Sequence, residues 1–330
     1  MYMCTNLYRP YCVCIGLIAA LWSHVASANN APDYPTKGVR VIVPFPPGSG
    51  IDLVTRIVVP RVAESIGHAF IIDNRGGAGG IVGTESAARA SPDGYTLYVG
   101  GTSLVVKPLT EKVSFSARDF APISRFASVP FLLVVNPAST PARSVQDLVG
   151  LARSKPGQLN YASTGNWTTP HLTSELFRQQ AKLNVVHVPY KGSGPALADL
   201  MGGHVDMFFC NMLSATPHVL GGRLAALAVT SLQRSPVVPN VPTMSESGLP
   251  NFETATWFGI MGPTGVSERV ISRIFAESQK ALRRPEVQKE LLSQGGTPAL
   301  DKSPSDMSDY IRSETDKWGK LLKTLNVRKS

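Results

Sequence analysis

Apolar residues along the chain alternate between two spacings, one typical of strands and one typical of helices. A β-branched run at residues 39–43 leads into a loop of proline, glycine and serine, and apolar residues then recur at helical spacing up to Ile66. This order predicts a buried strand, a tight loop and an amphipathic helix. Further strands are expected at residues 69–73, 95–99, 131–135, 160–163, 185–189, 205–210, 224–230 and 256–261. Further helices are expected at residues 81–90, 144–155, 196–201, 214–220, 268–284 and 303–325, and after the loop at residues 163–171. Ser144 and Ser303 are the expected N-caps of the helices that start there.

The strand and helix patterns fall into two blocks. The pattern restarts near Phe126 and gives way to a proline-rich segment after Ser231. Alternating units of this kind predict an α/β fold with two lobes and a chain that crosses between them twice. We expect residues 29–128 and 232–330 to form one lobe and residues 129–231 to form the other. A cleft between two lobes is a usual place for a small ligand.

Three loops between a strand and a helix are rich in glycine and hydroxyl residues. In the first, Gly48 and Gly50 allow backbone N–H groups to turn outward, and the following helix adds its own unpaired N–H groups and positive dipole end. Similar loops occupy residues 100–103 and 163–171. Such loops suit an anion, a carboxylate or a phosphate. An ordinary strand-to-helix connection has the same sequence pattern, so the pattern alone leaves both interpretations open.

The first 28 residues have the features of a secretory signal. Arg9 is their single charged residue, an apolar run covers residues 11–21, and Ala26-Ser27-Ala28 suits signal peptidase. We predict a secretory signal that is cleaved after Ala28 and directs export of the chain. A membrane anchor is the alternative, but the apolar run is far shorter than the ~20 residues that a spanning helix needs. Of the four cysteines only Cys210 lies beyond this segment, so disulfides would not hold the exported chain.

The chain lacks the usual sequence motifs of catalysis, metal binding and cofactor binding. It contains no HExxH, paired CxxC, GxSxG or Walker lysine. Gly77-Ala78-Gly79 begins a dinucleotide motif, but the third glycine falls at Gly83, one position too late. The net charge is +9, yet lysines and arginines are scattered, which favours small anions over nucleic acid. We therefore expect no cofactor, no metal and no nucleic-acid partner, and a monomer.

Six blocks of sequence carry a family resemblance. They read VPFPPGSGID, IDNRGGAGGIVGTESAARASPDGYTLYVGGTS, LNYASTGNWTTPHL, HVPYKGSGPALADLMGGHVDMFF, PHVLGGRLAALAVTSLQRSPVVPNVPTMSESGLPNFE and WFGIMGPTG. In this order they resemble the periplasmic solute receptors of the tripartite tricarboxylate transporters, also called the Bug family. The resemblance covers almost all of the chain beyond residue 28.

The resemblance implies a Venus-flytrap binding protein of the periplasmic type II class, which is not an enzyme. Such a receptor holds a ligand carboxylate between its lobes through backbone amides, hydroxyls and bridging water, and delivers it to a membrane permease. The first lobe would grip the ligand with Phe45, Pro47, Gly48, Ser49 and Asp52. The second lobe would use Ser163, Thr164, Gly165 and Asn166. Further candidates are Gly101, Thr102, Ser103, Tyr190 and Lys191.

Two departures from the family pattern bear on the ligand. Trp167 stands where the family commonly has a small residue, and Cys210 stands where many members have an aspartate. An indole in the cleft could stack on an apolar or aromatic ligand. The loss of an anionic side chain would remove a partner for a ligand ammonium. We therefore hypothesise a carboxylic acid without an amino group, with aromatic acids as one possibility, and include both residues among the binding candidates.

Three functions remain open from the sequence. The first is an exported carboxylate receptor that closes around its ligand by a hinge. The second is an enzyme acting on organic acids on the same scaffold, for which Asp52 could serve as a base and Cys210 as a nucleophile. For Cys210 we favour a small buried apolar role instead. The third is a ligand-sensing partner of a membrane kinase, which differs from a transport receptor only in what touches its outer surface.

Overall fold

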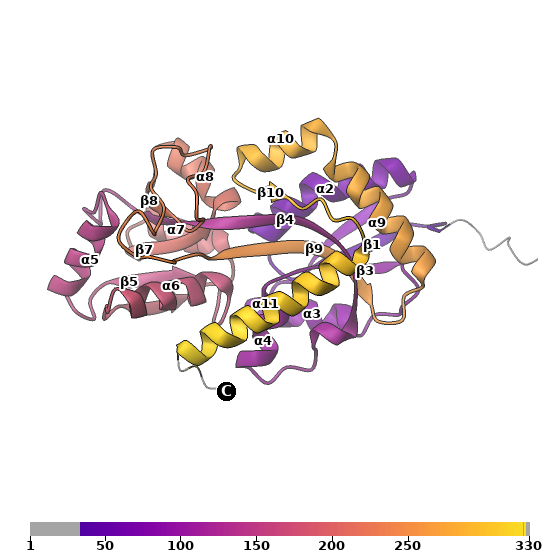
Figure 1. The fold of residues 1–330 in the computed structure, drawn as a ribbon, viewed down its shortest axis with the longest axis horizontal. Coiled ribbons are helices and arrows are strands. Elements are labelled where there is room, and N and C mark those ends of the chain that lie inside the picture. Colours follow the sequence, from indigo (N-terminus) through magenta and orange to yellow (C-terminus); the bar gives the residue numbers. More distant parts are fainter. Residues whose placement is uncertain (1–33, 326, 328–330) are drawn as a thin grey trace, which may run out of the picture. The chain divides into compact units, whose positions relative to one another are not determined.

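Strand β4 (Phe120–Val135) runs through both lobes of the computed structural model and pairs with strands of each (Figure 1). The structure describes residues 34–325 and residue 327, and the chain from Lys37 onward groups into one compact unit. Among the described residues, ten strands form one sheet in the order β2-β1-β3-β9-β4-β7-β5-β6, with β8 and β10 also paired to β4. The sheet is continuous because β4 belongs to both of its halves.

The first lobe is built around the N-terminal part of β4. Strands β1, β2 and β3 are parallel to one another, and β9 runs antiparallel between β3 and β4. The other strands of this lobe are β1 (Val39–Val43), β2 (Phe70–Asn74), β3 (Thr96–Gly101), β9 (Ala255–Pro263) and β10 (Thr297–Pro298). Its helices are α2 (Gly50–Ile66), α3 (Ile81–Ala88), α4 (Ser103–Thr110), α9 (Glu268–Leu282), α10 (Pro285–Ser293) and α11 (Pro304–Thr324), with the short 3-10 turns η1 (Ala78–Gly80) and η2 (Ala117–Asp119).

The second lobe is built around the C-terminal part of β4. There β7 and β8 pair with β4 in antiparallel fashion, whereas β5 lies parallel between β6 and β7. The strands are β5 (Asn160–Ser163), β6 (Val186–Pro189), β7 (Met207–Asn211) and β8 (Ala225–Val229). The helices are α5 (Val145–Ser154), α6 (Thr169–Gln180), α7 (Ser193–Met201) and α8 (Met212–Leu220).

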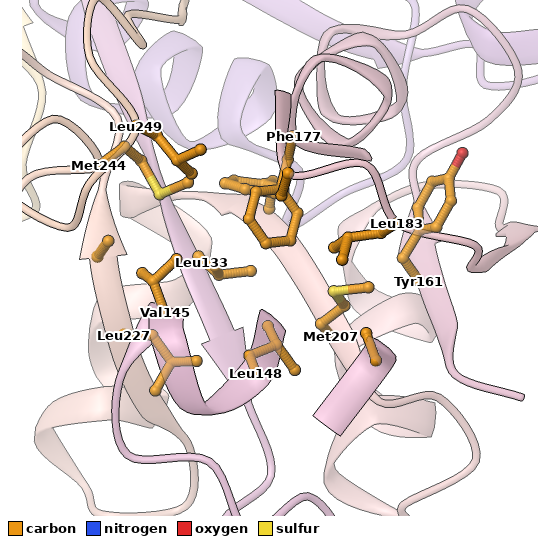
Figure 2. Close-up of a cluster of buried hydrophobic side chains, with 14 of the residues drawn as sticks. Leu133, Val145, Leu148, Tyr161, Phe177, Leu183, Met207, Leu227, Met244 and Leu249 are labelled. Atoms are coloured by element: carbon orange, nitrogen blue, oxygen red, sulfur yellow. The ribbon is translucent and has the colours of Figure 1, made fainter. Parts of the chain in front are cut away.

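Each lobe has its own buried cluster of apolar side chains. In the second lobe, alternate residues of β4 and β7 point to the same face of the sheet, so Leu133 and Met207 converge with Phe177 of α6 (Figure 2). In the first lobe, Trp257 of β9 and Trp318 of α11 are both almost completely buried. Helix α11 packs along β4 of the first lobe and so returns the end of the chain to the strand that links the lobes (Figure 1).

Most of the elements expected from the apolar pattern are confirmed, including Ser144 as the N-cap of α5, where its hydroxyl accepts from the Asp147 N–H. The chain passes from the first lobe to the second within β4 and returns before β9, which confirms the two predicted crossings. The exact lobe boundaries, at residues 128 and 231, remain a prediction. The predicted signal segment lies outside the described residues. No helix in the described part of the chain is both long and apolar enough to cross a membrane.

Three details of the sequence prediction are wrong. Strand β4 begins at Phe120 and not near residue 131, because the edge of β9 continues to pair with it past Pro122 and Pro130. Helices α4 and α10 were not expected, since each is short and contains or begins with a proline. Ser303 is the N-cap of α11, but its hydroxyl donates to the Asp306 carboxylate and caps no backbone N–H.

Candidate functional site

The starts of four helices meet at one hollow, which we call the central pocket. Its wall contains Ser49, Gly50 and Ile51 of α2, residues 101–103 at α4, residues 168–170 at α6 and Ser193 of α7. Asn211, the N-cap of α8, also lines it. All five positions follow the carboxyl end of a strand, which is where ligands bind in open α/β sheets. The hollow measures about 520 Å³, including the part open to solvent.

The helix starts offer hydrogen-bond donors to this pocket. Helices α2, α4, α6 and α7 have no side-chain acceptor bonded at their N-caps. At α2 the reason is visible, because the Ser49 hydroxyl donates to the carbonyl of Pro46, 2.7 Å away. The first N–H groups of such helices remain available, and the helix dipoles place partial positive charge at the same point. This arrangement can hold an anion by backbone donors alone.

The central pocket has no charged lining residue, and part of its wall is apolar. No lysine, arginine, histidine, aspartate or glutamate lines it among the described residues. Its apolar side includes Phe45, Phe131 and Phe258. Tyr98 also lines the pocket, but its hydroxyl lies 2.8 Å from that of Thr84, and burial raises the pKa of the phenol, so Tyr98 is neutral. The pocket therefore combines neutral donors with an apolar wall.

A second hollow, which we call the side hollow, adjoins the central pocket. The two share Phe45 and Thr164 in their linings. The wall of the side hollow is formed by residues 77–80, Lys107, Glu111, residues 165–167 and residues 189–191. Unlike the central pocket it contains charged side chains. Tyr190 donates from its hydroxyl to Asp199, 2.7 Å away, and burial together with this carboxylate raises the pKa of Tyr190 to about 12.

Asp52 supports the first loop from behind. Its carboxylate accepts from the Gly48 N–H at 2.8 Å, from Arg56 at 2.9 Å and from the Asn74 amide at 2.9 Å. Burial raises the pKa of Asp52, but these hydrogen bonds outweigh burial and hold it below its usual value. Asn74 also donates to the carbonyl of Phe45. The carboxylate is therefore engaged with the loop backbone and does not line the pocket.

Two stacked histidines, of which His171 is buried and His187 half-buried, support the loop at residues 163–168. The rings of His171 and His187 stack with their centroids 3.9 Å apart. His187 Nε2 lies 2.6 Å from the Ser163 hydroxyl, and His171 Nδ1 accepts from the Trp167 N–H at 2.9 Å. Burial lowers the pKa of His171 to about 3 and that of His187 to about 4, so both rings are neutral near pH 7. The loop conformation thus depends on neutral imidazole rings.

The structure separates the sixteen sequence candidates into three groups. The candidates that line the central pocket are Phe45, Ser49, Gly101, Thr102, Ser103 and Thr164. The candidates that line only the side hollow are Gly165, Asn166, Trp167, Tyr190 and Lys191. The candidates that line neither hollow are Pro47, Gly48, Asp52, Ser163 and Cys210. Gly48 borders a further surface hollow beside α8, while Ser163 is fully buried and bonds within its own loop.

Cys210 lies one layer behind the pocket. Its side chain is fully buried, and burial raises the pKa of its thiol. Successive residues of a strand point to opposite faces, so the next residue, Asn211, reaches the pocket. The strand-end rule could have found Asn211, because it follows the apolar run of β7 directly. No sequence pattern marked Thr256 and Phe258 as pocket residues, since both come from the distant strand β9.

Comparison with known proteins identifies close relatives. The family model "Tripartite tricarboxylate transporter family receptor" matches residues 54–327. A protein encoded in the tcbD–tcbE intergenic region of Pseudomonas sp. strain P51 is 40% identical over 313 residues, which covers 94% of this chain and 93% of the relative.

Three solved structures share the fold closely. The periplasmic binding protein BugD has a TM-score of 0.86 at 29% identity, covering 90% of this chain and 100% of its own. Rpa4515 from R. palustris, solved with adipate, has a TM-score of 0.87 at 33% identity over 90% and 100% of the two chains. MatC from Rhodopseudomonas palustris, solved with bound malate, has a TM-score of 0.82 at 29% identity over 88% and 100%.

Proposed function

The chain belongs to the tripartite tricarboxylate transporter receptor family, and from this premise we propose that it captures a small carboxylate without an amino group in the central pocket. The members of this family are periplasmic solute-binding receptors and not enzymes. We further propose that the protein, once exported, delivers its ligand to a permease of the tripartite tricarboxylate type. The enzyme interpretation of the sequence is thereby dropped.

The convergence of helix starts on the uncharged central pocket carries the proposal. A carboxylate there would accept from backbone N–H groups and meet the positive ends of several helix dipoles. A ligand ammonium would meet the same positive ends with no acidic side chain to pair with, because none lines the pocket. Because the pocket favours a carboxylate and disfavours an ammonium, we expect the ligand to lack an amino group. This argument replaces the one from Cys210 in the sequence, because the Cys210 side chain does not reach the pocket.

The apolar wall narrows the ligand class further. Phe45, Phe131 and Phe258 would contact the hydrocarbon part of an organic acid. Two relatives were solved with the dicarboxylates adipate and malate. A dicarboxylate or an aromatic acid with an apolar body fits both the donors and the phenylalanines. Micromolar binding, about −8 kcal/mol, is within reach of such a set of contacts.

Both lobes contribute to the central pocket, which supports a closing mechanism. Ser49 and Thr102 come from the first lobe, whereas Thr168 and Asn211 come from the second. A ligand that contacts both lobes binds the closed state more tightly than an open one. It therefore shifts the protein toward closure in proportion to that difference in affinity. Asp52 and Ser163 would act as supports of the two loops and not as ligand contacts.

Thermal unfolding against a ligand panel tests the proposal. The exported protein would be denatured and refolded to remove carried-over ligand, and then heated with dicarboxylates, tricarboxylates, aromatic acids, amino acids and sugars. A ligand at about 100 times its dissociation constant adds about 2.7 kcal/mol to the free energy of unfolding, a rise of several degrees in Tm. We expect shifts with carboxylates that lack an amino group. A shift only with amino acids or sugars, or no shift with any carboxylate, would overturn the proposal.

A further inference from the structure

Lys107 is a buried lysine of the first lobe that reaches a backbone carbonyl of the second. Its Nζ lies 2.7 Å from the carbonyl oxygen of Asn166 and 2.5 Å from Oε1 of Glu111. The side chain of Lys107 is only 2% exposed. An ammonium removed from water is stable only where charged and polar partners replace its hydration. One of the two partners, Glu111, lies a helical turn further along α4, and the other belongs to the opposite lobe.

The backbone around this contact is shaped for close approach of the lobes. A Cβ atom on Gly79 would lie 2.9 Å from Lys107 Nζ, and a Cβ atom on Gly165 would lie 3.3 Å from the Cα of Gly79. Both glycines have positive φ angles, +63° and +130°. The absence of side chains at these two positions leaves room for the lysine between the loops.

Trp167 provides an apolar contact beside the lysine. It adopts a φ of +53°, which is rare for a bulky residue, and its side chain packs against the buried cluster that includes Leu104 of α4 and Leu172 of α6. The backbone N–H of Trp167 donates to His171 Nδ1 of the same lobe. The segment 165–167 is therefore anchored in the second lobe, joined to the first by the hydrogen bond from Lys107, and packed through Trp167 on a cluster that draws residues from both lobes.

We propose that Lys107 is a positioning residue that latches segment 165–167 to the first lobe in the closed state and so slows ligand release. The segment lies between Thr164 and Thr168, and both of these residues line the central pocket. When the lobes separate, the Asn166 carbonyl moves away from Lys107, and the loop that carries it moves away from the ligand. The contact of Lys107 with Asn166 is therefore coupled to the contacts between the loop and the ligand. The inference rests on the proposed function for the choice of ligand. The effect of Lys107 on the closed state does not depend on that choice.

Replacement of Lys107 by methionine tests the latch. Lys107→Met keeps an unbranched side chain that is one heavy atom shorter and removes the charge and the donors. Lys112→Met is the matched control, since Lys112 is exposed on the segment that follows α4. With adipate as the probe in stopped-flow measurements, we expect Lys107→Met to raise the dissociation rate about tenfold and to change the association rate less than twofold. Lys112→Met should match the wild-type protein in both rates.

A measurement without ligand separates the latch from the proposed function. Spin labels on cysteines placed at the exposed Lys155 and Lys289, one in each lobe, would report the distance between lobes, and buried Cys210 would stay unlabelled. We expect Lys107→Met to move the ligand-free distance distribution toward longer values. If adipate fails to bind the wild-type protein, adipate is wrong as a ligand, while the label distances still test the latch.

Lys107→Arg distinguishes a latch from simple packing. The arginine keeps the positive charge and several donors, so we expect it to retain most of the wild-type closed population and to slow release relative to Lys107→Met. The latch is refuted if Lys107→Met leaves both the dissociation rate and the label distances unchanged. It is equally refuted if methionine and arginine lower the Tm and accelerate release to the same extent.

Discussion

Asp52 and Asn211 are both polar residues at the starts of helices, but they occupy different positions relative to the central pocket. Asp52 follows the glycine loop closely in sequence, yet its two carboxylate oxygens accept from Gly48, Arg56 and Asn74. Asn211 caps α8 by accepting from the Ser214 N–H at 3.1 Å, and it still lines the central pocket. The sequence analysis named Asp52 as a binding candidate and did not name Asn211. The structure reverses their positions, because Asn211 lines the central pocket and Asp52 does not.

Trp167 is the residue whose role the structure changes most. The sequence suggested a stacking surface for an aromatic ligand, but the indole lines the side hollow and packs against a buried cluster that draws residues from both lobes. These two roles predict different ligand profiles for Trp167→Gly. If the indole acts with Lys107 in holding the closed state, the substitution weakens every bound carboxylate by a similar factor. If the indole stacks on the ligand, the loss is confined to aromatic acids.

We expect the first result, a uniform loss of about fivefold to tenfold, which corresponds to about 1–1.4 kcal/mol. Calorimetric titration of wild type and Trp167→Gly with one aliphatic dicarboxylate and one aromatic acid would measure it. Trp318→Phe serves as a control for general loss of indole packing, because Trp318 is buried in the first lobe away from both hollows. An affinity for the aliphatic acid that does not change would contradict the interlobe role.

Helix starts are the elements that build the pocket, so a single N–H group should matter. Thr169 is the first residue of α6, and the preceding residue, Thr168, has an extended backbone with ψ of 164° that accepts a following proline. Thr169→Pro therefore removes the backbone N–H and the side-chain hydroxyl of a residue that lines the pocket, while leaving the helix in place. A hydrogen bond to a charged group contributes about 1.5–3 kcal/mol, so we expect the ligand affinity to fall about 10-fold to 100-fold.

The start of helix α9, in the first lobe, supplies the control. Glu268 is the exposed first residue of α9, and Ser267 before it is also extended, with ψ of 146°. Glu268→Pro thus makes the same backbone change at a helix start that does not line the pocket. Its affinity should equal that of the wild-type protein. Equal affinity for Thr169→Pro and Glu268→Pro would show that the α6 donor does not contact the ligand.

At the scale of the whole molecule, the buried His171 makes the free energy of unfolding depend on pH. His171 has a pKa of about 3 in the folded protein, well below its ordinary value of 6.5. Between these two values the unfolded chain binds a proton that the native protein does not. The contribution of neutral His171 to the free energy of unfolding is therefore fully present above pH 6.5, and it is lost as the pH falls from 6.5 toward 3.

We expect a slope that approaches about 1.4 kcal/mol per pH unit from this one proton. His171→Asn keeps an acceptor for the Trp167 N–H without a titrating ring, so its stability should depend on pH less steeply by one proton. Urea unfolding between pH 4 and pH 8 would measure both profiles. His204→Asn, at an exposed histidine, should keep the wild-type slope. Parallel profiles for wild type and His171→Asn would contradict this linkage.

The order of elements in the molecule could be predicted from local sequence, and its long-range pairings could not. A β-branched run identified β1, and short strand-like runs identified β3 and β5; each leads into a loop of glycine or hydroxyl residues that the sequence also marked, because strand propensity and turn chemistry are local. The same patterns marked Ser49, Thr102 and Thr164, which line the central pocket. Strand β4 was recognised only in part, since Pro122 and Pro130 disguise a strand that pairing with β9 sustains.

The sequence by itself determined the alternating α/β fold, the two crossings and the family, because apolar periodicity and six ordered motifs are properties of the linear chain. Tertiary structure alone decided which residues meet. It brings Phe258 of β9 to the same wall as Phe45, joins Lys107 to Asn166 across 59 positions of sequence, and turns Asp52 and Cys210 away from the pocket. Such contacts depend on the angle between lobes and on the face that each side chain takes, and neither is encoded in any short segment.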